Sequence, residues 1–302
     1  MRLRRSALIT AMILLAGACG DDGGGEATPV EEGEGTTSTV GGEAPPVFPA
    51  GTTMAALQQK GKIIIGIKFD QRGFGLKNPS TGKIEGFDEE MSEIVANAIF
   101  GSGADGKIEF VEAKSKDREV FIEQGKVDLV VATYTINDER KARVDFAGPY
   151  FVARQDIMVK ADDNSIKSVE DLNGKKVCSV QGSTSLKNLM AKAPQADTSI
   201  TFDIYSKCAD AMGDGRVDAV TTDDAILAGL VTDSDGQFKL LGAPFTEEPY
   251  GMGLKKGDQA FRDFLNDVIE DSYTSGEWKA GFEETLGKDG LPVPEPPPVV
   301  RY

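Results

Sequence analysis

Residues 125–140 read GKVDLVVATYTINDER, and the interpretation of the fold starts from this stretch. A glycine turn leads into the apolar residues 129–132, which predict a buried β-strand. The strand delivers Thr133, Thr135 and Arg140 to its carboxyl end, where ligands bind in open α/β sheets. Hydroxyl groups and a guanidinium supply the charge-assisted hydrogen bonds that a free carboxylate requires. The alternative for Arg140 is a solvated residue at the start of a helix.

A related string occurs later in the chain. Residues 215–220 read GRVDAV and parallel residues 125–130, GKVDLV, so both contain a Gly-x-Val-Asp turn before an apolar run. Continuing this alignment places Thr133 opposite Asp223. Two α/β lobes that face each other would put these residues on opposite walls of one cleft. The alternative is that Gly-x-Val-Asp is a common helix-to-strand turn and marks no repeat.

Strands and helices alternate along most of the chain, which predicts α/β sheets with helices on their faces. We expect strands at 63–67, 108–111, 127–132, 155–160, 176–180, 201–205, 217–221 and 250–255, and helices at 86–100, 120–124, 185–193, 208–214 and 259–273. We expect two lobes, each a mostly parallel sheet flanked by helices. The expected divisions are 1–18 signal peptide, 19–50 lipidated cysteine and tether, 51–150 with 247–290 first lobe, 151–246 second lobe, and 291–302 proline-rich tail.

The N-terminus predicts export. Three arginines among the first five residues precede an apolar segment at 7–16 and small residues before Cys19, which describes a secretory signal. The segment is too short to span a bilayer as a stable helix. Its end resembles the lipobox of bacterial lipoproteins, which implies lipidation of Cys19 and a membrane anchor without a transmembrane helix. Ala16 stands where that motif usually has leucine, and an ordinary signal peptide with a chance cysteine is the alternative.

Two segments are unsuited to a folded core. Residues 21–49 are rich in Gly, Glu, Thr, Ser and Pro, and their scarcity of large apolar side chains predicts a disordered tether. Residues 291–300 have a similar character because of their prolines. The remaining residues, 52–290, are too many for one small core and suit two compact lobes.

Composition excludes several classes of partner and site. The formal net charge of −16 would become −19 on loss of the three signal-peptide arginines, which argues against nucleic acid and anionic membrane surfaces. The chain contains no histidine, so the usual general base and the commonest zinc ligand are missing. We therefore expect no metal site, no cofactor and no enzymatic activity. In an exported protein, the remaining pair Cys178 and Cys208 suggests a disulfide, with two separate buried thiols as the alternative.

Several strings, taken in their order and spacing, resemble the bacterial extracellular solute-binding proteins of family 3, which are the polar amino-acid-binding components of ABC importers. The resemblance implies a type II periplasmic-binding-protein fold with a double-crossing hinge near residues 149–154 and 243–250. It also implies a monomer, held at the outer face of the cytoplasmic membrane, that delivers its ligand to ABC permease subunits. The strings are GIKFDQ at 66–71, GFD at 86–88, G-x-VD at 125–128, the stretch around Arg140, SV-x-DL-x-GK at 168–175, QGST at 181–184 and DAV-x-x-D at 218–223.

Two strings, KFDQ at 68–71 and SKDR at 115–118, most resemble the branch that binds glutamate and aspartate. A proline commonly follows Asp-Gln in that branch, and Arg72 stands there in this chain. An acidic amino acid needs one anion for its ammonium group and cations for two carboxylates.

The resemblance assigns the ligand's ammonium group to Asp223. It assigns the α-carboxylate to Arg140, aided by the Thr135 hydroxyl and by backbone N–H groups near Ser183 and Thr184 at a helix start. Lys68 and Arg118 remain for the side-chain carboxylate. The candidate ligand-binding residues are thus Lys68, Arg118, Thr133, Thr135, Arg140, Ser183, Thr184 and Asp223.

Each assignment has a structural alternative. Lys68 could be an edge lysine that snorkels into solvent, Arg118 a solvated helix residue, and Asp223 a surface acid. Ser183 and Thr184 could be simple helix caps. Tyr134 or Phe69 could cover the ligand's aliphatic part, or could be plain core residues. The alternatives differ from the assignments in whether each side chain is exposed to solvent, packed in a core or free to bind a ligand. The sequence leaves this open.

Three other functions compete with glutamate or aspartate binding. The first is the same type of protein with another ligand, such as glutamine, cystine or histidine. The second is a dehydratase or a lytic transglycosylase, because enzymes of both kinds resemble this fold; such chemistry requires a positioned acid with a tuned pKa. The third is a sensory ligand-binding module, which would act as the partner of another receptor.

Overall fold

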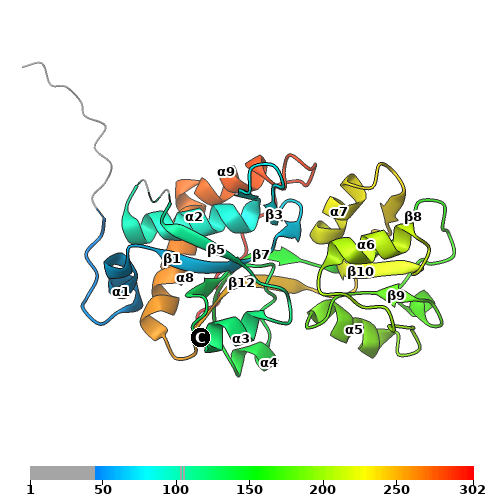
Figure 1. Cartoon of the computed structure of the whole chain (residues 1–302), viewed down its shortest axis with the longest axis horizontal. Coiled ribbons are helices and arrows are strands. Elements are labelled where there is room, and N and C mark those ends of the chain that lie inside the picture. The colour runs from blue at the N-terminus through cyan, green and yellow to red at the C-terminus, as the bar shows by residue number, and fades with distance from the viewer. Residues whose placement is uncertain (1–44, 103, 105) are drawn as a thin grey trace, which may run out of the picture. The chain divides into compact units, whose positions relative to one another are not determined.

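A computed structural model of the chain describes residues 45–102, 104 and 106–302 (Figure 1). The expected signal peptide, Cys19 and most of the expected tether lie outside the described residues. No helix within the described part combines the length and the apolar character that crossing a bilayer requires.

The chain alternates short strands with helices, as the sequence pattern predicts. The first part contains α1 (Thr53–Lys60), β1 (Ile63–Ile67), β2 (Asp70–Gln71), β3 (Gly75–Lys77), β4 (Ile84–Glu85), α2 (Phe87–Phe100), β5 (Ile108–Glu112), α3 (Arg118–Glu123), β6 (Leu129–Val130), α4 (Asp138–Lys141) and β7 (Asp145–Ala153). The second part contains β8 (Gln155–Lys160), the 3₁₀ turn η1 (Glu170–Leu172), β9 (Val177–Cys178), α5 (Thr184–Lys192), α6 (Tyr205–Gly213), β10 (Ala219–Asp223), α7 (Asp224–Thr232) and β11 (Phe238–Leu240). The last part contains β12 (Glu248–Leu254), α8 (Gln259–Ser275) and α9 (Glu277–Glu284).

The first lobe is built on a five-stranded sheet with the order β5-β1-β6-β12-β7. Strand β1 runs parallel to both neighbours, so that Ile65 pairs with Phe110 on one side and Leu129 on the other. Strand β12 runs antiparallel to β6 and β7. Alternate side chains of β1 enter different cores: Ile63 and Ile65 pack with α2, α8 and α9, whereas Ile64 packs with α3.

The second lobe is built on a four-stranded sheet with the order β11-β8-β10-β9. Only the β10–β9 pair is parallel among these strands. Helices α6 and α7 cover one face and α5 covers the other. The predicted strand at 201–205 is reduced to an isolated bridge between Phe202 and Val180, because Tyr205 already begins α6. The expected two-lobe α/β class is confirmed, with sheets that are mixed rather than mostly parallel.

The two Gly-x-Val-Asp turns are equivalent in the structure. Gly125 and Gly215 both have left-handed backbones, with φ of 66° and 73°. In the first lobe, the Asp128 carboxylate accepts a hydrogen bond from the N–H of Ile64 on β1 at 2.7 Å. In the second lobe, the Asp218 carboxylate accepts one from the N–H of Lys176, just before β9, at 2.8 Å. The shared string therefore marks the same helix-to-strand junction in both lobes.

The chain passes between the lobes twice. The first crossing is at Arg154, between β7 of the five-stranded sheet and β8 of the four-stranded sheet. The second lies between β11 and β12, where the chain returns to pair with β7. Both crossings fall where the sequence predicts the hinge. Strand pairs that span two lobes permit hinge-type closure around a ligand.

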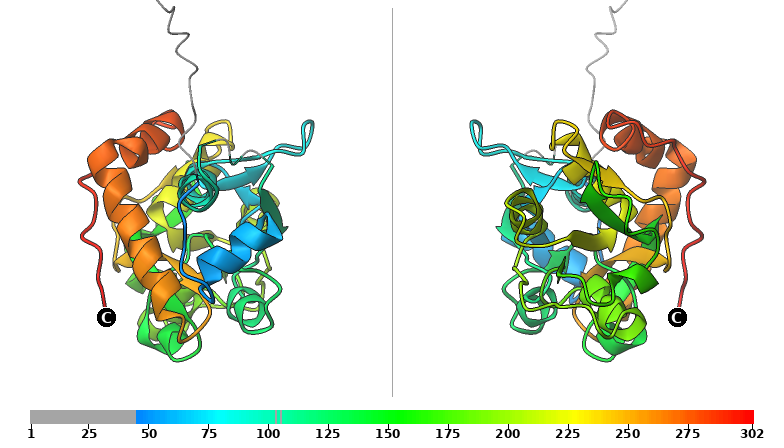
Figure 2. Two further views of the ribbon diagram at one scale, coloured as in Figure 1. Left: turned by 90° about the vertical axis from the view of Figure 1, so that its left-hand side faces the viewer. Right: turned by 90° about the vertical axis from the view of Figure 1, so that its right-hand side faces the viewer.

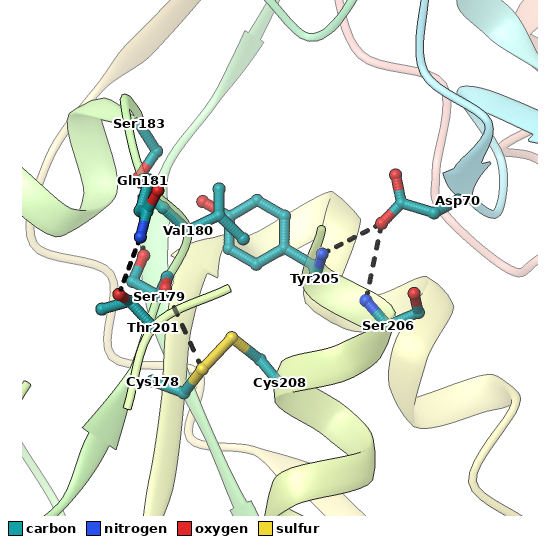
Figure 3. Close-up of a disulfide and its surroundings, with 10 residues drawn as sticks. All are labelled: Asp70, Cys178, Ser179, Val180, Gln181, Ser183, Thr201, Tyr205, Ser206 and Cys208. Atoms are coloured by element: carbon teal, nitrogen blue, oxygen red, sulfur yellow. Dashed lines mark hydrogen bonds between the residues drawn. A yellow bond between two sulfur atoms is a disulfide. The ribbon is translucent and has the colours of Figure 1, made fainter. Parts of the chain in front are cut away.

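A disulfide joins Cys178 to Cys208, as the sequence suggests (Figure 3). The Cα atoms are 5.6 Å apart, and both side chains are fully buried. Cys178 ends β9 and Cys208 lies on α6, so the bond fastens this helix to its sheet.

The proline-rich tail differs from the expected tether-like segment, because it lies against the first lobe. The N–H of Val300 donates to the carbonyl of Gly148, and the Tyr302 hydroxyl accepts a hydrogen bond from the N–H of Phe146, both at 2.9 Å. Arg301 forms salt bridges with Asp267 and Glu270 of α8, and Figure 2 shows the tail running beside this helix. Backbone and side-chain hydrogen bonds thus compensate for the tail's scarcity of large apolar side chains.

Candidate functional site

The backbone is strained three residues after the end of β6. Thr133 has a φ of 43°, a left-handed conformation that is unfavourable for a β-branched side chain. Its N–H donates to Oδ2 of Asp88, and its hydroxyl donates to Oε1 of Gln71, both at 2.9 Å. These partners hold the backbone in place, and strained residues of this kind are concentrated at functional sites.

Arg118 is buried beside Thr133, with 2 % of its surface exposed, so the solvated alternative is wrong. Its Nη1 donates to the carbonyls of Ala132 at 2.9 Å and Thr133 at 3.0 Å. Its guanidinium carbon lies 4.3 Å from the centre of the Tyr134 ring. The Nη2 group makes no hydrogen bond to the described residues, so it remains free to donate to an anion.

Lys68, the residue directly after β1, is also buried, at 4 % exposed, so it does not snorkel into solvent. Its Nζ donates to Oγ of Ser115 at 2.9 Å. Burial, followed by the charge of Arg118, lowers the pKa of Lys68 to about 7. A buried ammonium group next to a second cation requires an anion to balance it.

Arg140 lies between the two lobes with 6 % of its surface exposed, which excludes the solvated alternative. Its Nη1 donates to the Thr135 carbonyl at 2.7 Å, and its Nη2 donates across the lobes to the Gly182 carbonyl at 3.2 Å. Its Nε donates to Oε1 of Glu119 at 3.1 Å. Burial and the charge of Arg118 lower the pKa of Arg140 to about 10, so it stays charged at neutral pH.

The start of α5 faces Arg140 from the second lobe. Ser183 is the N-cap, and its hydroxyl accepts a hydrogen bond from the N–H of Leu186 at 3.0 Å. The Thr184 hydroxyl lies 3.4 Å from the Thr135 hydroxyl of the first lobe. A pocket of about 410 Å³ opens here, lined by Lys116, Glu119, Asn137, Glu139, Arg140, Arg143, Gly182, Ser183, Thr184, Leu186, Lys187 and Met190. Ser183 is thus a helix cap that also borders an inter-lobe pocket.

Asp223 ends β10 and is buried, at 4 % exposed, so it is not a surface acid. Its Oδ2 accepts a hydrogen bond from the Tyr250 hydroxyl, and its Oδ1 accepts one from the Ser185 hydroxyl at 3.4 Å. Burial, followed by the charge of Glu248, raises the pKa of Asp223 to about 7. The carboxylate therefore has neutral donors but needs a cation to be stable in its charged form.

Sequence reasoning missed three acidic or phenolic side chains that hold these residues. Glu119 binds Arg140, Tyr250 binds Asp223, and Asp88 accepts hydrogen bonds from Thr133 and from the Tyr150 hydroxyl. Burial raises the pKa of Asp88 to about 6. The Gly-Phe-Asp string offered a signal for Asp88, whereas nothing local distinguished Glu119 or Tyr250.

The two aromatic candidates differ in environment. Tyr134 is fully buried, and its ring centre lies 4.7 Å from that of Phe146, so it belongs to the core under Arg118. Phe69 is half-buried, and Nζ of Lys77 lies 5.0 Å from its ring centre. Tyr134 therefore supports a cation rather than offering a free apolar face.

The site combines buried charges of both signs. Within the described residues, Lys68, Arg118 and Asp223 form no salt bridge, and of the predicted residues only Arg140 has one, to Glu119 at 3.1 Å. An unpaired buried charge is costly. The described part also contains no cluster of side chains suited to a metal ion. The arrangement therefore suits a small ligand that carries both charges.

Residues 63–288 match the sequence profile of the bacterial extracellular solute-binding proteins, family 3. The chain belongs to this family. The match covers both lobes and every candidate ligand-binding residue.

Two relatives and one solved structure illustrate the similarity. The glutamine-binding protein GlnH of the ABC transporter of Bacillus subtilis is 42% identical over 238 residues, 78% of this chain and 85% of the relative. The glutamate-binding protein GluB of Corynebacterium glutamicum is 39% identical over 260 residues, 82% and 86% of the two chains. The structure of the ancestral amino acid-binding protein AncCDT-1, a precursor of cyclohexadienyl dehydratase, matches with a TM-score of 0.70 and 30% identity, covering 78% of this chain and all of the other.

Proposed function

We propose that this chain is the extracytoplasmic solute-binding component of an ABC importer and captures an acidic L-amino acid, glutamate first and aspartate second. The observation that supports the ligand class is the set of buried, unpaired charges: Lys68 and Arg118 on one side and Asp223 on the other. A zwitterion with an acidic side chain would neutralise them together.

In this proposal the Asp223 carboxylate binds the ligand's ammonium group. The positive charge of that group would stabilise Asp223 in its ionised form. Arg140 binds the α-carboxylate, because two of its five N–H donors are unused by the described residues. The Thr135 hydroxyl and the N–H groups near Ser183 and Thr184 complete this end of the site. Thr133 supports it from behind, because its N–H and hydroxyl already donate to Asp88 and Gln71.

Lys68 and Arg118 bind the side-chain carboxylate. Lys68 uses one of three ammonium donors on Ser115, and Arg118 has Nη2 available. These donors match the two oxygens of one carboxylate. The permease that receives the ligand and the lipid anchor at Cys19 belong to the same proposal, supported by the family and by the N-terminal sequence.

Glutamine is the second candidate. The relative at 42% identity is a glutamine-binding protein, and the lowered pKa of Lys68 allows a neutral amine that accepts a hydrogen bond from an amide N–H. Calorimetric titration with free amino acids tests the choice. We expect glutamate to bind at least tenfold more tightly than glutamine, because an amide leaves one buried cation underpaired. Equal or tighter binding of glutamine would overturn the acidic specificity.

We also propose that the chain has no turnover. The raised pKa values of Asp88 and Asp223 are of the kind that acid–base catalysis uses, so this point needs its own test. Incubation of the protein with bound amino acid for several hours should return the ligand unchanged by mass spectrometry. Consumption of the ligand would favour a dehydratase-like enzyme instead.

A further inference from the structure

Asp70, the first residue of β2 in the first lobe, reaches the N-terminus of a second-lobe helix. Its Oδ2 accepts hydrogen bonds from the backbone N–H groups of Tyr205 at 2.9 Å and Ser206 at 3.5 Å (Figure 3). These groups open α6, whose own N-cap residue, Ile204, provides no side-chain acceptor. The first lobe therefore supplies the cap that the second-lobe sequence lacks.

Arg72, two residues later, reaches the C-terminus of a different second-lobe helix. Its Nη1 donates to Oδ1 of Asp233, the residue that follows α7, at 2.9 Å. Its Nε and Nη2 donate to Oδ1 of Asp289 in the first lobe, at 3.0 and 2.9 Å. Asp289 thus holds the guanidinium in position while Asp233 binds it across the lobes.

The contact with α7 depends on a glycine. A Cβ atom at Gly229 would lie 3.1 Å from the Arg72 carbonyl oxygen and 3.2 Å from the Arg72 Cβ. These separations are tighter than ordinary contact, so a larger side chain would push the two lobes apart here. Glycine lowers the stability of a helix interior, so its presence within α7 indicates that the close approach of Arg72 requires a residue without a side chain.

The two charges match the helix dipoles that they meet. Asp70 places an anion at the positive N-terminus of α6, and Arg72 places a cation at the negative C-terminus of α7. Both arrangements are favourable, and both exist only while the lobes are in contact. Neither side chain makes a hydrogen bond or salt bridge to a candidate ligand-binding residue within the described part of the chain.

We propose that residues 70–72 form a closure latch that stabilises the closed arrangement of the lobes and so sets ligand affinity without touching the ligand. This inference rests on the proposed function, because it requires a ligand that binds between the lobes. A ligand that binds the closed form is then stabilised by its own contacts and by those of the latch. The free energy of closing the lobes contributes to the measured binding free energy.

The test is calorimetry of Asp70→Ala and Arg72→Ala with the amino acid that the wild type binds most tightly. We expect about a 5–10-fold increase in Kd for Asp70→Ala and about a 2–5-fold increase for Arg72→Ala. The Arg72→Ala effect should be larger at about 0.01 M salt and nearly vanish at about 1 M, because Asp233 and Arg72 are half exposed. Arg216→Ala is the matched control, since Arg216 pairs with Asp214 inside the second lobe.

A double-mutant cycle in Kd between Arg72→Ala and Asp233→Asn separates a latch from a general loss of stability. The latch predicts that the double variant binds no more weakly than the weaker single variant. The latch also predicts that each substitution raises Kd by the same factor for every amino acid that binds. A preference for glutamine would therefore refute the proposed specificity without affecting the test of the latch. Kd values of both single variants within about twofold of the Arg216→Ala control at low salt would overturn the latch.

Discussion

The Tyr250 hydroxyl donates a hydrogen bond to Asp223 and thereby joins β12 of the first lobe to the end of β10 in the second. Tyr250 also forms a β-bridge with Thr135, the residue whose carbonyl holds Arg140. The proposed ammonium-binding acid and the proposed carboxylate-binding arginine are thus connected through one tyrosine. This connection explains how two lobes can present opposite charges to a single small ligand.

Replacing Asp223 by asparagine should nearly abolish ligand binding, because the ammonium group loses its only proposed counter-ion. We expect a loss of about 2–5 kcal/mol in binding free energy, measured by calorimetry at neutral pH. Asparagine retains an acceptor for Tyr250, so the fold should persist. Near-normal affinity of this variant would exclude Asp223 from the ammonium site.

The same variant should change the pH dependence of stability in the unliganded protein. The folded-state pKa of Asp223, about 7, lies above its unfolded value, so ionisation destabilises the native state as pH rises from about 4 to 7. Asp223→Asn should therefore exceed the wild type by about 2–4 kcal/mol in unfolding free energy above pH 7 and match it near pH 4. Urea unfolding at both pH values measures this. An equal difference at both pH values would contradict the assignment.

Affinity for the ligand should be highest near pH 7. Below this pH, protons compete with the ligand's ammonium group for Asp223, and above it Lys68 must take up a proton to bind a carboxylate. Each process weakens binding by up to about tenfold per pH unit. Calorimetry at pH 5, 7 and 9 should show both limbs, with Lys68→Met losing the alkaline limb alone. A flat profile would mean that neither group titrates in the site.

Removing the disulfide with Cys178→Ser and Cys208→Ser should lower the unfolding free energy by about 3–4 kcal/mol, because a loop of 30 residues is released in the unfolded state. Chemical denaturation of the variant beside the wild type measures the change. Thiol labelling of the native, unreduced wild type is the control and should find no free thiol at either position.

Replacing Tyr302 by phenylalanine should cost about 1 kcal/mol of stability, because the buried N–H of Phe146 loses its acceptor. Ligand affinity should not change, since the hydrogen bonds and salt bridges of Val300, Arg301 and Tyr302 to the described residues are all with the first lobe. The guanidinium of Arg262 and the ammonium of Lys141 also lie over the Tyr302 ring, at 4.3 and 4.4 Å, so Tyr302→Ala should cost more. Thermal unfolding compares the three proteins, and a drop in affinity would contradict the tail's restriction to one lobe.

The two-lobe α/β architecture could be predicted from local patterns along the chain. Three features are local signals, because strand and helix periodicity are properties of neighbouring residues. They are the β-branched run at β1, the amphipathic pattern of α2 and the Gly-x-Val-Asp turns before β6 and β10. A disulfide between Cys178 and Cys208 could also be expected, because an isolated pair of cysteines in an exported chain suggests one. The packing of the C-terminal tail against the first lobe could not be predicted, because residues 291–300 lack the periodicity that predicts packing.

Which charges are buried and which are paired could be seen only in the folded chain. Lys68, Arg118, Arg140 and Asp223 each had a solvent-exposed alternative that the sequence could not exclude, because burial depends on segments far away in the chain. The partners Glu119 and Tyr250 lie 21 and 27 residues from the groups they bind. The contacts of Asp70 and Arg72 likewise depend on the ends of α6 and α7, which lie more than a hundred residues away in the chain. Such contacts are set by how the lobes pack, which local sequence patterns do not encode.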